Sequence, residues 1–320
     1  MIATRLTERL GIRHPVISAP MALAAGGRLA GAVTAAGGLG LIGGGYGDAD
    51  WLETEFRAAG SHRVGCGFIT WSLARRPALL EATLARSPAA LLLSFGDPAP
   101  FARAVRDAGA TLICQVQGLA HARRALEVGS DVVVAQGAEA GGHGARRATM
   151  TLVPEIADEI ARTGHGALLC AAGGVADGRG LAAALMLGAD GVLVGSRLWA
   201  SDEALVHPAM LAAAVAAGGD DTIRSTVMDV ARRLDWPPGW TARVLKNGFT
   251  ARWHDDPAGL LAVAEAESAR WRAAWAAGDV DVANTFVGEA TGLIDRIEPA
   301  GAIVERMVGD ARALLDRGAR

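Results

Sequence analysis

Short apolar segments rich in valine, isoleucine and leucine recur through the first 200 residues, and segments of helical length separate them. Most of these segments are continuously apolar rather than alternating, which is typical of parallel strands that are buried on both faces. Eight such strands are the number that closes a (β/α)8 barrel. The eight segments are 14–19, 38–42, 64–69, 90–95, 111–115, 131–135, 167–171 and 191–194.

The segments between these strands have the length and the endings of helices. Residues 28–36, 98–108, 119–128 and 180–187 are alanine-rich, and Gly37, Gly109, Gly129 and Gly188 follow them. Glycine often ends a helix, because it adopts positive φ angles without strain. The alternation predicts an α/β fold, a TIM (β/α)8 barrel whose strand order is sequential.

The alternation stops after Leu198. Residues 201–283 place Trp236, Trp240, Trp253, Trp271 and Trp275 between or within helical segments such as 207–217 and 257–277. We expect a helical C-terminal extension with tryptophans in its core; a second hypothesis is that the extension covers the site as a lid and excludes water. An amphipathic helix at 300–315 then returns to the barrel, which is predicted to comprise residues 1–200 and 284–320.

The charge of the chain points to a small-molecule partner. Its 31 basic and 34 acidic residues nearly balance, so the chain carries no footprint for nucleic acid or for an anionic membrane. Residues 1–8 include charges where a signal peptide needs apolar residues, and no apolar stretch reaches the roughly 20 residues of a membrane helix. We therefore expect a cytoplasmic protein.

Three cysteines, Cys66, Cys114 and Cys170, lie in apolar segments far apart in the sequence. They form no Cys-x-x-Cys motif, so neither a disulfide framework nor a zinc site is predicted. They fall in the third, fifth and seventh strands, and alternate strands contribute each layer of a barrel interior. We expect one interior layer to contain all three; a nucleophilic cysteine is the less favoured hypothesis.

One histidine, His143, follows the sixth strand in a glycine-rich connection that runs from residue 137 to residue 151. Barrel enzymes carry their sites on the loops after the strands, and a connection of this length is usually functional. An imidazole can transfer protons near neutral pH, so we expect His143 to be catalytic or to contact the substrate. Glu139 is expected to orient this loop through backbone N–H groups.

Gly173-Gly174 follows the seventh strand and Gly195-Ser196 follows the eighth, and together they predict a phosphate site. The N–H groups of Gly173, Gly174 and Gly195, with the Ser196 hydroxyl and the following helix, can hold a phosphate monoester. Glycines after the second strand are also expected to let the backbone approach a ring system or phosphate closely. Glu139 is the only carboxylate among the strand ends, so no metal site is predicted.

Five motifs together resemble the nitronate monooxygenase family, formerly called the 2-nitropropane dioxygenases. They are Ala-Pro-Met at 19–21, Ser-Phe-Gly-Asp-Pro at 94–98, Gln-Gly-Ala-Glu-Ala-Gly-Gly-His at 136–143, Ala-Gly-Gly-Val-Ala-Asp-Gly-Arg-Gly at 172–180 and Leu-Gly-Ala-Asp-Gly-Val-Leu-Val-Gly-Ser-Arg at 187–197. The resemblance spans the barrel and continues weakly at 245–247 and 288–294. It implies an FMN-dependent TIM barrel enzyme.

The resemblance also implies residue roles and a reaction. The cofactor-binding residues would be Pro20, Met21, Ala22, Gln115, Gln136, Gly141, Gly142, Gly173, Gly174, Gly195 and Ser196, with the phosphate at the last four. The substrate pocket would include Met21, Thr70, Trp71 and the catalytic His143, although family members often have an asparagine just after the third strand. The expected reaction is oxidation of an alkyl nitronate by O2 to a carbonyl compound and nitrite, without nicotinamide. A homodimer is one assembly to test.

Two other functions remain open at this point. The first is an NAD(P)H-dependent flavin reductase of the same barrel type, similar to the FMN-dependent enoyl-acyl-carrier-protein reductases or to quinone reductases. The second is a non-catalytic flavin-binding barrel, which would bind FMN without turnover. The retained His143 loop argues against the second alternative.

Overall fold

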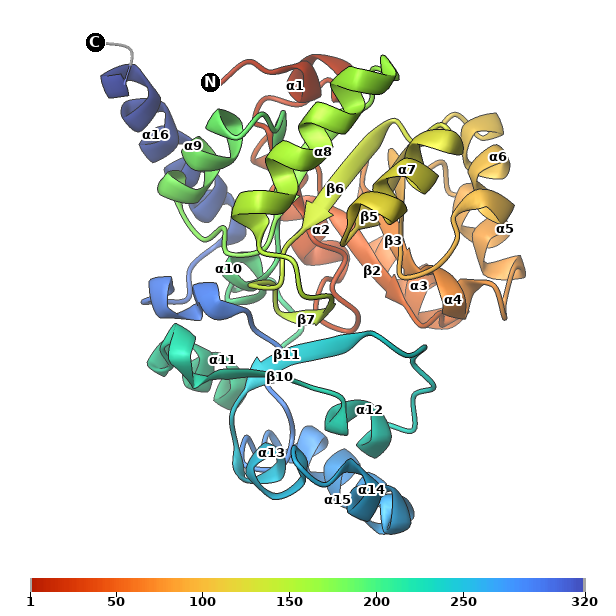
Figure 1. Cartoon of the computed structure of the whole chain (residues 1–320), viewed down its shortest axis with the longest axis vertical. Helices are drawn as coiled ribbons and strands as arrows, with labels where there is room; N and C mark the ends of the chain where they lie inside the picture. Colours follow the sequence, from red (N-terminus) through yellow and green to blue (C-terminus); the bar gives the residue numbers. More distant parts are fainter. Residues whose placement is uncertain (1, 319–320) are drawn as a thin grey trace.

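A computed structural model describes residues 2–318 and confirms the predicted barrel. Its eight parallel strands form one sheet in the order β1-β9-β8-β6-β5-β4-β3-β2. Helices surround this sheet on the outside (Figure 1). The two ends of this order meet, because a parallel bridge joins Ile17 of β1 to Leu39, just before β2, and the Ser18 N–H donates to the Leu39 carbonyl oxygen. The sheet therefore curls into a barrel, as the eight apolar segments predict.

Each strand lies within a few residues of its predicted segment, and α2, α6, α7 and α9 lie within a few residues of the four predicted helices. The strands are β1 (Val16–Ser18), β2 (Leu41–Gly45), β3 (Gly65–Ile69), β4 (Ala90–Ser94), β5 (Thr111–Val116), β6 (Val132–Gln136), β8 (Leu168–Ala172) and β9 (Gly191–Val194). The main outer helices are α2 (Gly27–Ala35), α3 (Ala49–Ala58), α5 (Ala78–Leu84), α6 (Ala99–Asp107), α7 (Leu119–Glu127), α8 (Thr149–Thr163) and α9 (Gly178–Met186). Short helices α1 (Arg5–Leu10), α4 (Thr70–Leu73) and α10 (Ser196–Trp199) complete the barrel.

The strands are apolar on both faces because each face meets a different part of the core. On β4, Leu92 points into the barrel, whereas Leu91 and Leu93 point outward to the helices. This alternation is the period of two that every strand imposes. Leu6 of α1 joins the interior cluster, so α1 closes the end of the barrel that lies opposite the carboxyl ends of the strands.

The three cysteines do not share one layer, which corrects the prediction. Cys170 lies in the barrel interior, whereas Cys66 and Cys114 pack between the strands and the helices. The prediction considered which strand carries each cysteine but not which face of the strand the side chain occupies. A shift of one residue along a strand moves a side chain to the other face. All three thiols are free and buried, and burial raises the pKa of Cys66 to about 12 and that of Cys114 to about 11. The cysteines therefore act as core residues.

Glycines on β2 and β3 make room for the segment that follows β1. A Cβ atom on Gly67 would lie 2.4 Å from Pro20 Cγ, and one on Gly43 would lie 2.2 Å from the Met21 carbonyl oxygen. The segment 20–22 therefore crosses the barrel mouth only because these positions lack side chains. Of the glycines after the second strand, which were expected to approach a ligand, Gly43 makes room for the Met21 backbone, whereas Gly45 lies in the lining of a cavity at the barrel mouth.

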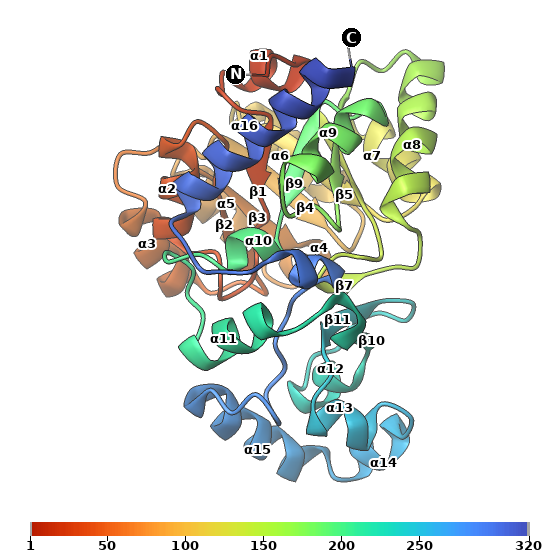
Figure 2. The same cartoon turned by 90° about the vertical axis from the view of Figure 1, so that its left-hand side faces the viewer.

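The extension predicted at 201–283 is mainly helical, and it also contains two strands that the sequence analysis did not predict. Its elements are α11 (Pro208–Ala216), η1 (Gly219–Asp221), β10 (Thr222–Ser225), α12 (Val227–Ala231), β11 (Thr241–Leu245), α13 (Gly248–Trp253), α14 (Pro257–Ala262) and α15 (Ala264–Ala277). In both views these elements gather at one end of the barrel (Figures 1 and 2). Trp253 and Trp271 are buried in the core of the extension with Phe249.

Two connections tie the extension to the barrel. Strand β11 pairs antiparallel with β10 and with β7 (Gly142–Gly144), the short strand that carries His143. After the extension, η2 (Glu289–Leu293) leads to α16 (Ala300–Gly318), which packs beside α9 and α2 on the outside of the barrel (Figure 2). Between residues 2 and 318, no helix combines the length and the apolar character needed to cross a bilayer.

The Gly67→Ala substitution tests the close approach at the barrel mouth. We expect it to lower the free energy of unfolding by about 1–3 kcal/mol, because the added methyl group overlaps the Pro20 ring in a packed site. Gly309→Ala on the exposed face of α16 is the matched control, since a Cβ there meets no atom within 4 Å. That control is expected to be neutral or stabilising by up to about 1 kcal/mol. Urea denaturation of both variants would measure the difference, and equal stabilities would contradict the tight packing.

Candidate active site

A cavity of about 260 Å³ opens where the carboxyl ends of the barrel strands meet the extension. The segments after β1, β6, β8 and β9 line it from the barrel side. The extension contributes Met210, Arg232, Trp236 and Trp275. A cavity at this end of a TIM barrel is the usual position of an active site.

The cavity brings together almost all of the predicted site residues. Its lining includes Pro20, Met21, Ala22, Gln115, Gln136, Gly141, Gly142, His143, Gly173, Gly174, Gly195 and Ser196. Thr70 and Trp71, predicted for the substrate pocket, lie outside this lining. Helix α4 begins at Thr70 directly after β3 and turns both side chains into the packing, where Trp71 meets Tyr46 and Trp236 edge-on.

His143 is held by contacts from three directions. Its backbone pairs with Ala242 of β11, and its carbonyl oxygen accepts a hydrogen bond from Gln136 Nε2 at 3.0 Å. Its Nε2 lies 3.0 Å from both carboxylate oxygens of Asp229 on α12. The Trp236 ring stacks on the imidazole with a centroid separation of 3.5 Å and an interplanar angle of 9°. The imidazole is therefore fixed in position and orientation.

The His143–Asp229 pair is nearly buried, with 8% and 6% of the two side chains exposed. Burial lowers the pKa of His143, and the hydrogen bond and charge of Asp229 oppose this shift, while Arg232 and Arg224 add to it. The net direction is downward, so the imidazole is neutral at neutral pH. A carboxylate only accepts, so Nε2 carries the proton and Nδ1 carries the lone pair. No hydrogen bond among residues 2–318 uses Nδ1.

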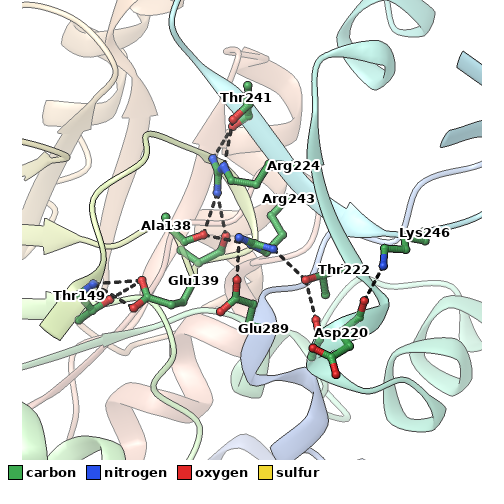
Figure 3. A network of polar contacts seen from close by, with 12 residues as sticks. Ala138, Glu139, Thr149, Asp220, Thr222, Arg224, Thr241, Arg243, Lys246 and Glu289 are labelled. Carbon is green, nitrogen blue, oxygen red and sulfur yellow. Dashed lines mark hydrogen bonds and ion pairs between the residues drawn. The ribbon is translucent and has the colours of Figure 1, made fainter. Parts of the chain in front are cut away.

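Two half-buried arginines of the extension anchor the loop that carries His143 (Figure 3). Arg224 of β10 donates to the carbonyl oxygen of Ala138 at 3.1 Å and to Thr241 Oγ1 at 2.9 Å. Arg243 of β11 donates to the same Ala138 oxygen at 3.0 Å and pairs with Glu289 at 2.8 Å. Burial and the charge of Arg243 lower the pKa of Arg224 to about 10, so it remains charged at neutral pH.

Glu139 orients the loop, as predicted. Its carboxylate oxygens accept the Thr149 N–H at 3.0 and 3.1 Å, and one of them also accepts the Thr149 hydroxyl at 2.9 Å (Figure 3). These bonds tie the start of the loop to the first residue of α8. Among residues 2–318, no group of three or more His, Cys, Asp or Glu side chains is arranged to hold a metal ion.

The residues predicted to bind a phosphate line the cavity and include hydrogen-bond donors. Gly173 and Gly174 both have positive φ angles, +97° and +79°, which favour glycine. A Cβ on Gly195 would make ordinary van der Waals contact with Ala19 at 3.7 Å, and Gly195 lines the cavity. The Ser196 hydroxyl accepts the Gly288 N–H at 2.8 Å, which leaves its own proton for a ligand.

Sequence reasoning missed the side chains that complete the site from the extension. Asp229, Arg232 and Trp236 lie in and after α12, and Tyr46 accepts a hydrogen bond from Trp236 Nε1 at 3.0 Å. Asp229 is 86 residues from His143 in the chain, and no motif or spacing links them. The only feature of the sequence that points to a contribution of the extension to the site is its high tryptophan content.

Comparisons with known proteins agree with this fold. The family model for nitronate monooxygenase matches residues 3–62 and 78–310. The nitronate monooxygenase npaC of Metarhizium robertsii is 36% identical over an alignment that covers 94% of this chain and 91% of that protein. FabK from Thermotoga maritima has a TM-score of 0.87 and 31% identity, with 100% of both chains covered. A nitroalkane oxidase from Streptomyces ansochromogenes has a TM-score of 0.78 and 26% identity, with 97% of this chain and 99% of that chain covered. The chain belongs to the nitronate monooxygenase family and is therefore an oxidoreductase.

Proposed function

We propose that this enzyme oxidises alkyl nitronates with O2 to a carbonyl compound and nitrite, with FMN as its cofactor. The observation that carries the proposal is the position of His143. Asp229 and Trp236 hold its imidazole in place, and His143 lines the same cavity as the predicted phosphate-binding segments at 173–174 and 195–196. Family membership supports nitronate oxidation in general. The cofactor and the role of each residue rest on the chemistry of the cavity.

The cavity lining suits both the phosphate and the ring of FMN. We assign the phosphate to the N–H groups of Gly173, Gly174 and Gly195 and to the Ser196 hydroxyl, because these residues line the cavity side by side at the ends of β8 and β9. The flavin ring would lie against Pro20, Met21 and Ala22, with Gln115, Gln136, Gly141 and Gly142 as further contacts. Bound FMN would take electrons from the substrate and pass them to O2, and the protein would supply position and electrostatics.

The hydrogen bond to Asp229 determines what His143 can do. With Nε2–H committed to the carboxylate, the free Nδ1 lone pair can accept a proton. For a neutral nitroalkane, the α-proton would move to Nδ1 and the electrons of the C–H bond would form the nitronate. Asp229 would stabilise the resulting imidazolium. For a substrate that is already a nitronate, this proton transfer is not needed.

We propose that residues 201–283 form a cover over an FMN-binding barrel made of residues 1–200 and 284–320. Trp236 and Trp275 of the cover line the cavity beside Phe286 of the barrel. Apolar walls of this kind exclude water, which strengthens the interaction between His143 and Asp229.

The absorption spectrum of the purified enzyme tests the cofactor. Bands in the near-ultraviolet and in the blue, with FMN released by heat, are expected. Oxygen uptake with propionate 3-nitronate tests the reaction, and nitrite is the product to measure. Rapid bleaching of the flavin by NADH without oxygen, with no nitrite formed aerobically, would favour the NAD(P)H-dependent reductase. Bound FMN with no turnover on nitronate, enoyl thioester or quinone would favour the non-catalytic barrel.

The variant His143→Ala tests the role of the imidazole. We expect FMN content to persist while turnover of the neutral substrate nitroethane falls by about 10²-fold or more, the contribution usual for acid–base catalysis. His121→Ala is a control, because His121 lies outside the cavity lining and stacks on Trp240. Nitrite release under saturating substrate measures both variants, and unchanged turnover in His143→Ala would remove His143 from the mechanism.

The variant Asp229→Asn tests the positioning of His143. Asp229 opposes the burial that lowers the pKa of His143, so its loss lowers that pKa further. The acidic limb of kcat/KM against pH is expected to move to lower pH, and the plateau for nitroethane to fall by about 10²-fold. Ethylnitronate needs no proton removal and is expected to lose less.

Asp235→Asn is the matched control for Asp229→Asn, because Asp235 lies six positions further along the chain and its side chain is 87% exposed. It is expected to keep the wild-type pH profile. Equal losses on nitroethane and ethylnitronate in Asp229→Asn, or an acidic limb displaced to higher pH, would contradict the positioning role.

A further inference from the structure

Residues 234–240 connect α12 to β11, and we call this segment the strap (Figure 1). It contains no helix or strand, and its Trp236 side chain lines the cavity. The stacked Trp236 ring covers one face of the His143 imidazole, and only 8% of the His143 side chain is exposed. The strap therefore shields part of the site from solvent.

The backbone of the strap has almost no hydrogen bonds. The Leu234 N–H donates to the carbonyl oxygen of Asp229 in α12 at 2.9 Å. Beyond Leu234, no backbone-to-backbone hydrogen bond between residues 2 and 318 involves residues 235–240. Pro237 and Pro238 have no N–H to donate. Segments with few protected backbone hydrogen bonds open at low free energy, so the strap can move while β11 stays paired with β7 and β10.

Aromatic side chains hold the strap instead. Trp236 Nε1 donates to the Tyr46 hydroxyl at 3.0 Å, and the Trp236 ring meets the Phe95 ring edge-on at a centroid distance of 5.2 Å. Trp240 also meets Phe95 edge-on, at 5.1 Å. Contacts of this kind are individually weak, and they can separate without the loss of a helix or a strand.

Phe95 is the barrel residue that both tryptophans of the strap contact. It follows β4 in the motif at 94–98, and it lines the cavity. Its φ angle is +64°, in the left-handed region that favours glycine. A residue with a side chain keeps such a conformation only where its surroundings impose it, and residues of this kind gather at functional sites. The proposed reaction gives Phe95 no role, whereas its contacts assign it to the strap.

We propose that the strap is a gate, which opens when Trp236 and Trp240 leave Phe95 and which gives small molecules access to His143. The proposal rests on the proposed function only for the reaction that follows access. Gly239 is the expected hinge, because its φ angle of +94° is strained for any residue with a side chain.

The variant Gly239→Ala tests the gate without a steric clash, because a Cβ at Gly239 meets no atom within 4 Å. Alanine is strained in the left-handed conformation of the closed strap, so the open population is expected to rise by about 5- to 30-fold. Gly109→Ala is the matched control. Gly109 follows α6 on the outside of the barrel, its φ angle is +70°, and a Cβ there also meets no atom within 4 Å.

Fluorine NMR of the full-length enzyme labelled with 5-fluorotryptophan measures the opening. The chain has eight tryptophans, and Trp236→Phe and Trp240→Phe assign the two resonances of the strap. Relaxation dispersion is expected to show microsecond-to-millisecond exchange at Trp236 and Trp240 but not at Trp253 and Trp271, in the core of the extension. The exchange is expected to increase in Gly239→Ala and to stay at the wild-type level in Gly109→Ala.

Carbethoxylation by diethyl pyrocarbonate measures access to His143 without any turnover. The rate at His143, followed by mass spectrometry of its peptide, is expected to rise in Gly239→Ala by the same factor as the open population. Gly109→Ala is expected to keep the wild-type rate. Tyr46→Phe removes the acceptor of the Trp236 N–H, and it is expected to raise the rate by about 2- to 10-fold. This variant carries the test if Gly239→Ala does not fold.

Absence of exchange at Trp236 and Trp240, or equal exchange at all eight tryptophans, would overturn the gate. An unchanged rate of carbethoxylation at His143 in both Gly239→Ala and Tyr46→Phe would also overturn it, because the strap would then move without controlling access. A wild-type enzyme that oxidises no nitronate would contradict the proposed function alone, since neither measurement depends on turnover.

Discussion

The pairing of β7 with β11 is the contact on which the site depends. It is a short antiparallel match, Gly142 to Gly144 against Thr241 to Arg243, yet it joins a loop of the barrel to the extension. Through it, the backbone of His143 is fixed by one part of the chain while the carboxylate of Asp229 arrives from another part. Neither the barrel alone nor the extension alone contains the pair.

The polar groups around this contact are satisfied, and that explains why a glycine-rich loop can hold a catalytic geometry. Glycines cost conformational entropy when they are ordered, so the loop needs fixed partners. The carbonyl oxygen of Ala138 receives donors from both Arg224 and Arg243, and Glu139 binds the first residue of α8. Charge-assisted bonds of this kind are stronger than neutral ones, and partial burial shields them from solvent. The loop is therefore held at several points on either side of His143.

The barrel could be predicted from the sequence because its physical causes are local. Continuous apolar segments mark strands buried on both faces, and glycines such as Gly109 and Gly129 mark helix ends, with φ angles of +70° and +74°. Most predicted site residues line the cavity for the same reason, since each follows a strand. Thr70 also follows a strand but starts a helix at once, which turns it away. Asp229 and Arg232 depend on how the extension docks, a long-range packing result that no periodicity encodes.

The charges around the cavity set the protonation state of His143. Burial lowers the pKa of His143 and the charges of Arg232 and Arg224 lower it further, whereas Asp229 opposes the shift, so the imidazole is neutral. A neutral imidazole is the form that can accept a proton, but its lowered pKa makes it a weak base. Asp229 would stabilise the imidazolium that forms when His143 takes a proton, so the docking of the extension on the barrel is what would make proton transfer in the cavity feasible.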